Sequence, residues 1–237
     1  MIKKPASVKM LALLAFLVTN LIWAAAGPVI KVTLDFIPSH IFLFLRFLVV
    51  GIILLPFTII ELKKNPVDKR DYFNLFILGV FSQTAIILIF DGLNYTTALD
   101  ATIIGVMGPL LSIAAGHYFY KEKVNKAVIL GTILAVIGTV FVVIEPIFNG
   151  SNSQIDTLHR LWGNILAVAY TLTFLIYVIW SKMSMGERST LFKKTLSFIH
   201  IRPMHQKYSP FILTVTSFYV GLITLVPFAL FEQYQTG

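Results

Sequence analysis

Seven long apolar runs dominate this sequence and constrain its fold more than any other feature. An α-helix rises about 1.5 Å per residue, so about 20 apolar residues cross the ~30 Å hydrocarbon core of a bilayer. Runs near this length cover residues 10–30, 41–60, 72–93, 101–120, 127–145, 161–181 and 210–231. Because backbone polar groups inside lipid must be satisfied within the protein, we predict an all-α integral membrane protein, a multi-span helical bundle.

Composition narrows the classes of partner. With 57 % hydrophobic and 13 % charged residues among 237, the chain is too apolar for a soluble domain. The net charge of +8 would indicate nucleic acid in a soluble protein, but here the basic residues lie between the apolar runs. We therefore expect the lipid bilayer as a partner and no nucleic acid. The absence of cysteine excludes disulfides and thiolate metal sites, and we expect no cofactor.

The basic residues also predict the orientation of the chain. Apart from Lys31, Arg46 and Arg160, every Lys and Arg lies in the N-terminal segment or in the second, fourth or sixth loop. Loops rich in Lys and Arg stay in the cytoplasm. The prediction is a multi-pass protein of the plasma membrane, of the bacterial inner membrane type, with a cytoplasmic N-terminus.

Residues 95–143 form a membrane hairpin, in which two apolar runs are joined by a turn with three lysines and one glutamate. Small residues, which let membrane helices pack closely, recur at Gly105, Gly108, Ser112 and Gly116 in the first run and at Gly131, Ala135 and Gly138 in the second. Proline removes a helix hydrogen bond, so we expect helix breaks at Pro28 and Pro109.

This hairpin carries a resemblance to a known family. The matching features are Thr96-Thr97-Ala98-Leu99 before the helix, Gly108-Pro109 within it, the Lys121-Glu122-Lys123 turn, and Gly131, Ala135 and Gly138 after it. Together they resemble the EamA domain of the drug/metabolite transporter (DMT) superfamily. The resemblance implies ten spans in two five-helix halves, and a permease that exports small metabolites or amino acids by alternating access. On that basis the chain looks truncated after the seventh of ten spans.

An internal repeat also indicates two related halves. The spacing from Phe47 to Pro56-Phe57 equals the spacing from Phe218 to Pro227-Phe228, although these two runs cross the membrane in opposite directions. This pattern is typical of an inverted-topology repeat. The predicted units are a first EamA repeat at 1–146 with spans one to five, an outer linker at 147–160, and a partial second repeat at 161–237 with spans six and seven.

The partial second repeat holds a long inner loop, residues 182–209. Its part 190–201 mixes basic and apolar residues, which fits either a segment lying on the anionic inner leaflet or a solvated basic loop. Aromatic residues near the ends of the runs are expected in the interfacial belts; these are Tyr118, Tyr120, Trp162 and Trp180.

Polar and aromatic side chains within the runs are candidates for substrate binding, because such groups are costly in lipid. The candidates are Asn20, Trp23, Arg46, Gln83, Tyr170 and Thr171. For Asn20 the alternative role is to join two helices by a hydrogen bond. Arg46 lies at the level of Asp91 and Asp100, so it is either a ligand or gate contact or one half of a structural ion pair.

Other functional classes fit less well. The five histidines are scattered and no catalytic constellation is present, so we expect no metal site and no enzyme. A seven-helix receptor-like protein would have the opposite orientation, and a non-transporting truncated product is a further alternative. For a transporter of a small-molecule substrate, proton coupling, facilitated diffusion and homodimer formation all stay open.

Overall fold

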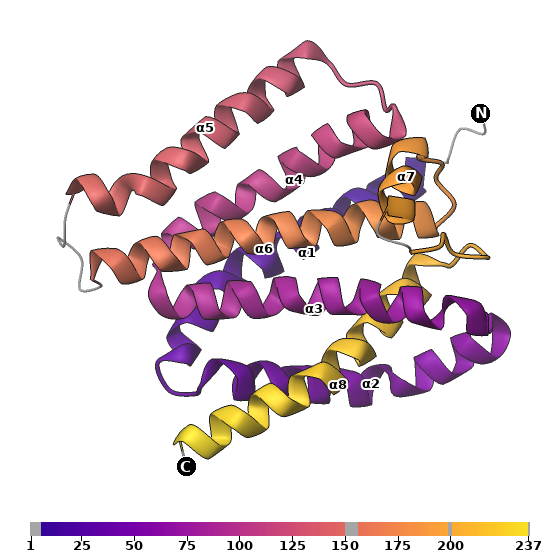
Figure 1. Ribbon diagram of the computed structural model, residues 1–237, viewed down its shortest axis with the longest axis horizontal. Coiled ribbons are helices and arrows are strands. Elements are labelled where there is room, and N and C mark those ends of the chain that lie inside the picture. The colour runs from indigo at the N-terminus through magenta and orange to yellow at the C-terminus, as the bar shows by residue number, and fades with distance from the viewer. Residues whose placement is uncertain (1–5, 150–155, 199–200, 237) are drawn as a thin grey trace.

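The computed structural model describes residues 6–149, 156–198 and 201–236, and within these residues all regular structure is helical (Figure 1). The helices are α1 (Ala6–Leu34), α2 (Ser39–Lys64), the 3-10 turn η1 (Lys69–Asp71), α3 (Tyr72–Tyr95), α4 (Ala98–Tyr120), α5 (Lys126–Asn149), α6 (Thr157–Ser184), α7 (Thr190–Phe198) and α8 (Pro210–Thr236). The prediction of an all-α fold is confirmed.

Seven of the described helices, α1 to α6 and α8, are long and apolar enough to cross a membrane. This count agrees with the sequence prediction and makes the chain a multi-pass membrane protein. The helices extend beyond the apolar runs because polar residues continue their end turns. For example, α6 begins at Thr157, where the Asp156 carboxylate accepts a hydrogen bond from the Leu158 N–H at 3.2 Å.

The membrane helices lie roughly in a row, from α5 through α4, α6 and α3 to α2 and α8 (Figure 1). Helix α3 is central, since it contacts α6 on one side and α2 and α8 on the other. Helix α1 crosses behind this row and contacts α4 and α3. The side chains of residues 9–25 on α1 are exposed. Following the predicted orientation, we call the end with the α2–α3 and α4–α5 turns the inner end and the opposite end the outer end.

Glycines bring α3 and α6 into backbone contact near the outer end. A Cβ atom at Gly163 would lie 2.7 Å from the backbone N of Thr96 and 2.8 Å from the carbonyl O of Gly92. The small-residue faces expected between α4 and α5 behave differently, because a Cβ atom at Gly105, Gly131 or Gly138 would have no neighbour within 4 Å. For these three glycines the expectation was wrong, because an added methyl group would meet no neighbouring helix, whereas Gly108 faces α6, where a Cβ atom would lie 3.6 Å from the Thr171 methyl group.

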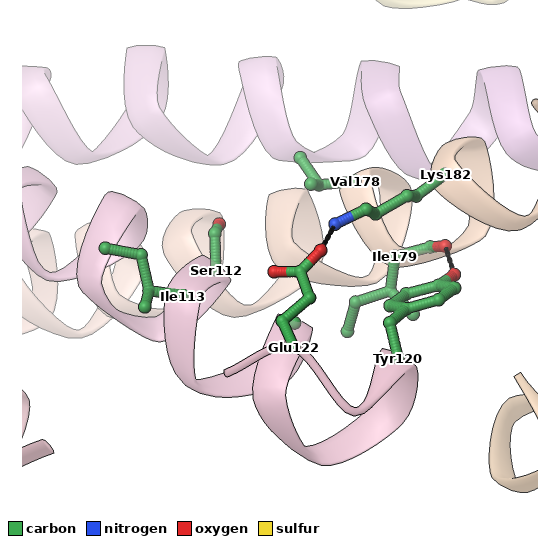
Figure 2. A pocket seen from close by; sticks show the side chains of 8 residues that line it. Ser112, Ile113, Tyr120, Glu122, Val178, Ile179 and Lys182 are labelled. Carbon is green, nitrogen blue, oxygen red and sulfur yellow. Dashed lines mark hydrogen bonds and ion pairs between the residues drawn. The ribbon is translucent and has the colours of Figure 1, made fainter. Parts of the chain in front are cut away.

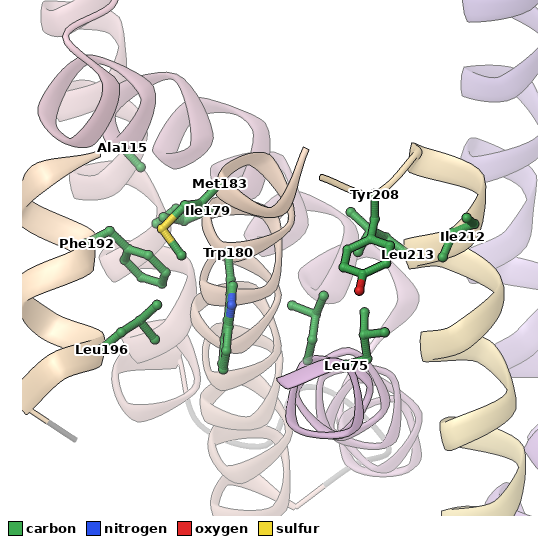
Figure 3. Close-up of a cluster of buried hydrophobic side chains, with 11 residues drawn as sticks. Leu75, Ala115, Ile179, Trp180, Met183, Phe192, Leu196, Tyr208, Ile212 and Leu213 are labelled. Carbon is green, nitrogen blue, oxygen red and sulfur yellow. The ribbon is translucent and has the colours of Figure 1, made fainter. Parts of the chain in front are cut away.

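Helix α7 lies at the inner end and packs two apolar side chains against the bundle (Figure 3). Phe192 and Leu196 are buried in a cluster with Trp180, Met183 and Ala115. Trp180 is 1 % exposed, so its expected place in an aromatic belt was wrong. Phe198, the last residue of α7, is 84 % exposed, so the leaflet alternative for 190–201 stays a prediction beside the solvated loop, and residues 199 and 200 lie outside the described residues.

A buried carboxylate ties the loop before α8 to the start of α3. Asp71 is fully buried and accepts hydrogen bonds from the backbone N–H of His205 at 2.9 Å and from the Tyr208 hydroxyl at 2.7 Å. Burial, together with the hydrogen bond to Asp71, raises the pKa of Tyr208 to about 12. The hydroxyl therefore remains a hydrogen-bond donor at any physiological pH.

Candidate functional site

A polar side chain lies buried near the middle of the α3–α8 interface. Gln83 on α3 is 3 % exposed, and its amide oxygen occupies the space that a Cβ atom at Gly221 of α8 would need. One turn earlier, a Cβ atom at Gly79 would lie 2.6 Å from the Cβ of Val220. The two glycines thus let α3 and α8 approach closely around the Gln83 amide.

Two polar atoms at this interface have no hydrogen-bond partner among the described residues. They are the Gln83 side-chain nitrogen and the hydroxyl oxygen of Ser217, which lies one turn before Gly221 on α8. A buried polar group left unpaired costs about 1–3 kcal/mol. Unpaired groups of this kind within a membrane span are typical of positions that bind a polar ligand. We define Gln83, Ser217 and Gly221 as the midspan site.

Stacked aromatic rings border the midspan site. The rings of Phe47 on α2 and Phe218 on α8 have centroids 4.5 Å apart and an interplanar angle of 1°. These two residues occupy matching positions in the predicted repeat. The same alignment pairs Arg46 with Ser217, which is the signal that could have identified Ser217 from the sequence.

The six predicted binding residues do not gather at one place. Gln83 lies in the midspan site, while Thr171 is buried on α6, where its hydroxyl donates to the Ala167 carbonyl at 3.0 Å. Tyr170 is half-buried beside the ring of Phe174. Thr171 also contacts α4, since a Cβ atom at Gly108 would lie 3.6 Å from its methyl group. This part of the chain contains an apolar crevice of about 370 Å³ between α4, α5 and α6.

The other three predicted binding residues lie on outward faces. The Asn20 amide donates to the Phe16 carbonyl of its own helix at 2.7 Å. Trp23 is 65 % exposed. Arg46 is exposed on α2 and forms no ion pair within the part of the chain that the structure describes. The structure therefore brings none of these three side chains to the midspan site.

Asp100 does bind an arginine, but the arginine is Arg160. The guanidinium contacts both carboxylate oxygens of Asp100, at 2.7 and 3.1 Å, and lies 2.8 Å from the Glu145 carboxylate. These contacts join the outer ends of α4, α5 and α6. Next to them, the Thr96 hydroxyl donates to the buried amide oxygen of Asn164, which ties α3 into the same group. The expected pair between Arg46 and Asp100 is thus replaced by a bond between two residues at helix ends.

Neither predicted helix break ends its helix. Helix α1 continues through Pro28, and α4 continues through Pro109. An interior proline removes one backbone hydrogen bond, and the flanking turns carry the helix on.

The inner ends of α4 and α6 enclose a recess of about 200 Å³ (Figure 2). An ion pair between Glu122 and Lys182 crosses it, and the Tyr120 hydroxyl donates to the Ile179 carbonyl. The ammonium group of Lys182 also lies 5.1 Å from the centre of the Tyr120 ring. Polar contacts therefore close the bundle at the inner end as well as at the outer end. The described residues contain no group of three His, Asp or Glu side chains arranged to hold a metal ion.

Comparison with known proteins gives a family. The sequence profile of the EamA-like transporter family matches residues 10–144. The uncharacterized transporter YetK of Bacillus subtilis is 28 % identical over 85 % of this chain and 54 % of its own length. An uncharacterized protein of Haemophilus influenzae is 34 % identical over 44 % of this chain and 81 % of its own length.

A mammalian relative is also similar. Solute carrier family 35 member G1 of Mus musculus is 31 % identical over 34 % of this chain and 22 % of its own length. No solved structure matches the chain. The chain spans about half of the length of YetK. Its profile match covers more than half of its residues, and with its multi-span helical bundle the chain belongs to the EamA-like transporter family.

Proposed function

We propose that this chain supplies seven spans of a secondary transporter that exports small metabolites, with amino acids as the leading substrate class. In this proposal the protein lies in the plasma membrane of a bacterial cell with its N-terminus in the cytoplasm. Residues 1–146 form one five-helix repeat, and residues 161–237 form part of a second one in the opposite orientation. The names of relatives such as YetK support transport, and the placement of lysines and arginines supports the orientation.

One observation carries the substrate site: the amide nitrogen of Gln83 and the hydroxyl of Ser217 are both buried at the α3–α8 interface with no hydrogen-bond partner among the described residues. Both groups donate hydrogen bonds, so they suit a substrate that presents acceptor oxygens, such as a carboxylate or a carbonyl. Rocking of α8 and α2 against α3 and α6 would open this interface to one side of the membrane at a time.

The test is metabolite transport by the purified chain in liposomes, with radiolabelled amino acids as the first probes. Replacing the donor in Gln83→Leu should lower the initial rate about tenfold or more, as expected when a hydrogen bond to a substrate is lost. The neighbouring residue Thr84 is exposed on α3. Thr84→Val should therefore leave the rate unchanged.

A folding defect is distinguished by thermal unfolding of both variants in detergent. Gln83→Leu removes an unpaired polar group, so its stability should equal or exceed that of the wild type. The proposal is overturned if Gln83→Leu transports as fast as Thr84→Val, or if no class of small metabolite crosses the membrane faster than in protein-free liposomes.

A further inference from the structure

Three titratable side chains from three helices meet at the outer end, apart from the contacts of Arg160. We define His40 on α2, Asp91 on α3 and Glu232 on α8 as the His40 triad. The Nδ1 atom of His40 lies 3.1 Å from a Glu232 oxygen, and its Nε2 atom lies 3.4 Å from an Asp91 oxygen. The side chains are 21 %, 30 % and 16 % exposed for His40, Asp91 and Glu232, so water can reach them.

The geometry of the triad determines which protonation state of the His40 ring it favours. A neutral imidazole has one N–H and one lone pair, so only one of its nitrogens can donate to a carboxylate. In this structure both ring nitrogens of His40 face carboxylate oxygens. With both carboxylates ionised, the arrangement is favourable only when His40 carries a proton on each nitrogen. The triad therefore favours one bound proton, the second ring proton of His40, between the two carboxylates.

Neighbouring groups of α2 also contact the two carboxylates of the triad. The Ser39 hydroxyl lies 3.3 Å from Asp91 and 3.4 Å from Glu232, and the Ile41 backbone N–H donates to Glu232 at 2.8 Å. The His40 ring stacks on Phe228 of α8, with centroids 5.6 Å apart.

The charged groups at the outer end of α1 and in the turn after it are Lys31 and Asp35. The Lys31 ammonium donates to the Leu93 carbonyl at the end of α3. The His40 ring is the group that contacts both Asp91 and Glu232.

We propose that the His40 triad is a proton-binding site that couples proton uptake to the position of α8. The proposal rests on the proposed transport function, for which the proton becomes the coupling ion. When the bound proton leaves from a ring nitrogen to water, neutral His40 remains between two carboxylates, whose mutual repulsion drives α8 away from α2 and α3. Binding of a proton from water restores the contact and closes the outer end.

The first experiment measures the proton directly by ¹⁵N NMR of the histidine rings, with the full chain in lipid nanodiscs. His40→Gln assigns the His40 signals. His159, an exposed residue beside the single carboxylate of Asp156, is the matched control. We expect His40 to be doubly protonated at pH 7.5. The double variant Asp91→Asn with Glu232→Gln should make His40 neutral at the same pH. Equal protonation of His40 and His159 would overturn the proton site.

The second experiment measures the movement of α8. The chain has no cysteine, so Ala229→Cys introduces a unique thiol at a buried position one turn before Glu232. Maleimide labelling of the purified protein should become faster between pH 6 and pH 8.5. The increase in rate should be about tenfold greater than in the same variant carrying His40→Gln, which is the control for ionisation of the thiol itself. Glu232→Gln should abolish the excess, and His159→Gln should retain it.

The two experiments separate the inference from the function on which it rests. A doubly protonated His40 combined with labelling that ignores Glu232→Gln would overturn the coupling to α8. If both experiments give the expected results while the liposomes move no metabolite, the transport proposal fails and the proton site stands.

Discussion

The guanidinium of Arg160 lies between two carboxylates that come from different helices. Its planar fork contacts both oxygens of Asp100, and a third nitrogen reaches Glu145. A lysine ammonium cannot reproduce this two-pronged geometry. Asp100 is 4 % exposed, so weakening its partner leaves a carboxylate that water cannot fully solvate.

At the residue scale we predict that Arg160→Lys lowers the free energy of unfolding by about 1–3 kcal/mol. Arg46→Lys is the matched control, because Arg46 is exposed and forms no ion pair among the described residues. It should change stability by less than about 0.5 kcal/mol. Thermal unfolding in detergent measures both variants, and equal losses would contradict the role assigned to Arg160.

At the scale of elements, two kinds of glycine occur in these helices. Gly163 and Gly92 lie where α6 and α3 touch backbone to backbone, whereas Gly105 faces open space. Glycine in a helix costs about 0.5–1 kcal/mol relative to alanine, and only a close approach offsets that cost. Whether a glycine lies in a close helix contact therefore decides whether its replacement by alanine lowers or raises the stability of the protein.

Gly163→Ala should destabilise the protein by about 1–3 kcal/mol, because its new methyl group would lie 2.7 Å from the Thr96 backbone N. Gly105→Ala should stabilise it by up to about 1 kcal/mol, since nothing lies within 4 Å of the new atom. Chemical unfolding of the two variants in mixed micelles checks the pair. Losses of similar size would show that the α3–α6 contact is looser than described.

The whole molecule shows which parts of this fold the sequence could predict. The helices follow from local hydropathy, so the seven membrane helices were predictable. Contacts between side chains on different helices were not predictable, because spacing along the chain does not tell which helix faces meet. His40 and Glu232 are 192 residues apart, and Asp71 and Tyr208 are 137 residues apart. Gln83 was predictable as a costly amide in a span, but its contact with Gly221 depends on the crossing of α3 and α8.

At this scale the predicted orientation can be tested with single cysteines in the otherwise cysteine-free chain. Leu158→Cys lies at the outer end, where Leu158 is 73 % exposed, and Lys123→Cys lies in the exposed α4–α5 turn. A membrane-impermeant maleimide should label Leu158→Cys in intact cells and Lys123→Cys only after permeabilisation. The reverse pattern would place the N-terminus outside the cell.

The buried carboxylate of Asp71 also has a consequence for biosynthesis. Its donors, the His205 N–H and the Tyr208 hydroxyl, follow it by 134 and 137 residues. At about 5–20 residues per second, the ribosome completes them on the order of ten seconds after Asp71. During this delay a desolvated carboxylate without donors would be costly, so the start of α3 has to stay hydrated while α4, α5 and α6 are inserted. The inner loop before α8 therefore sets the time at which the start of α3 can become buried.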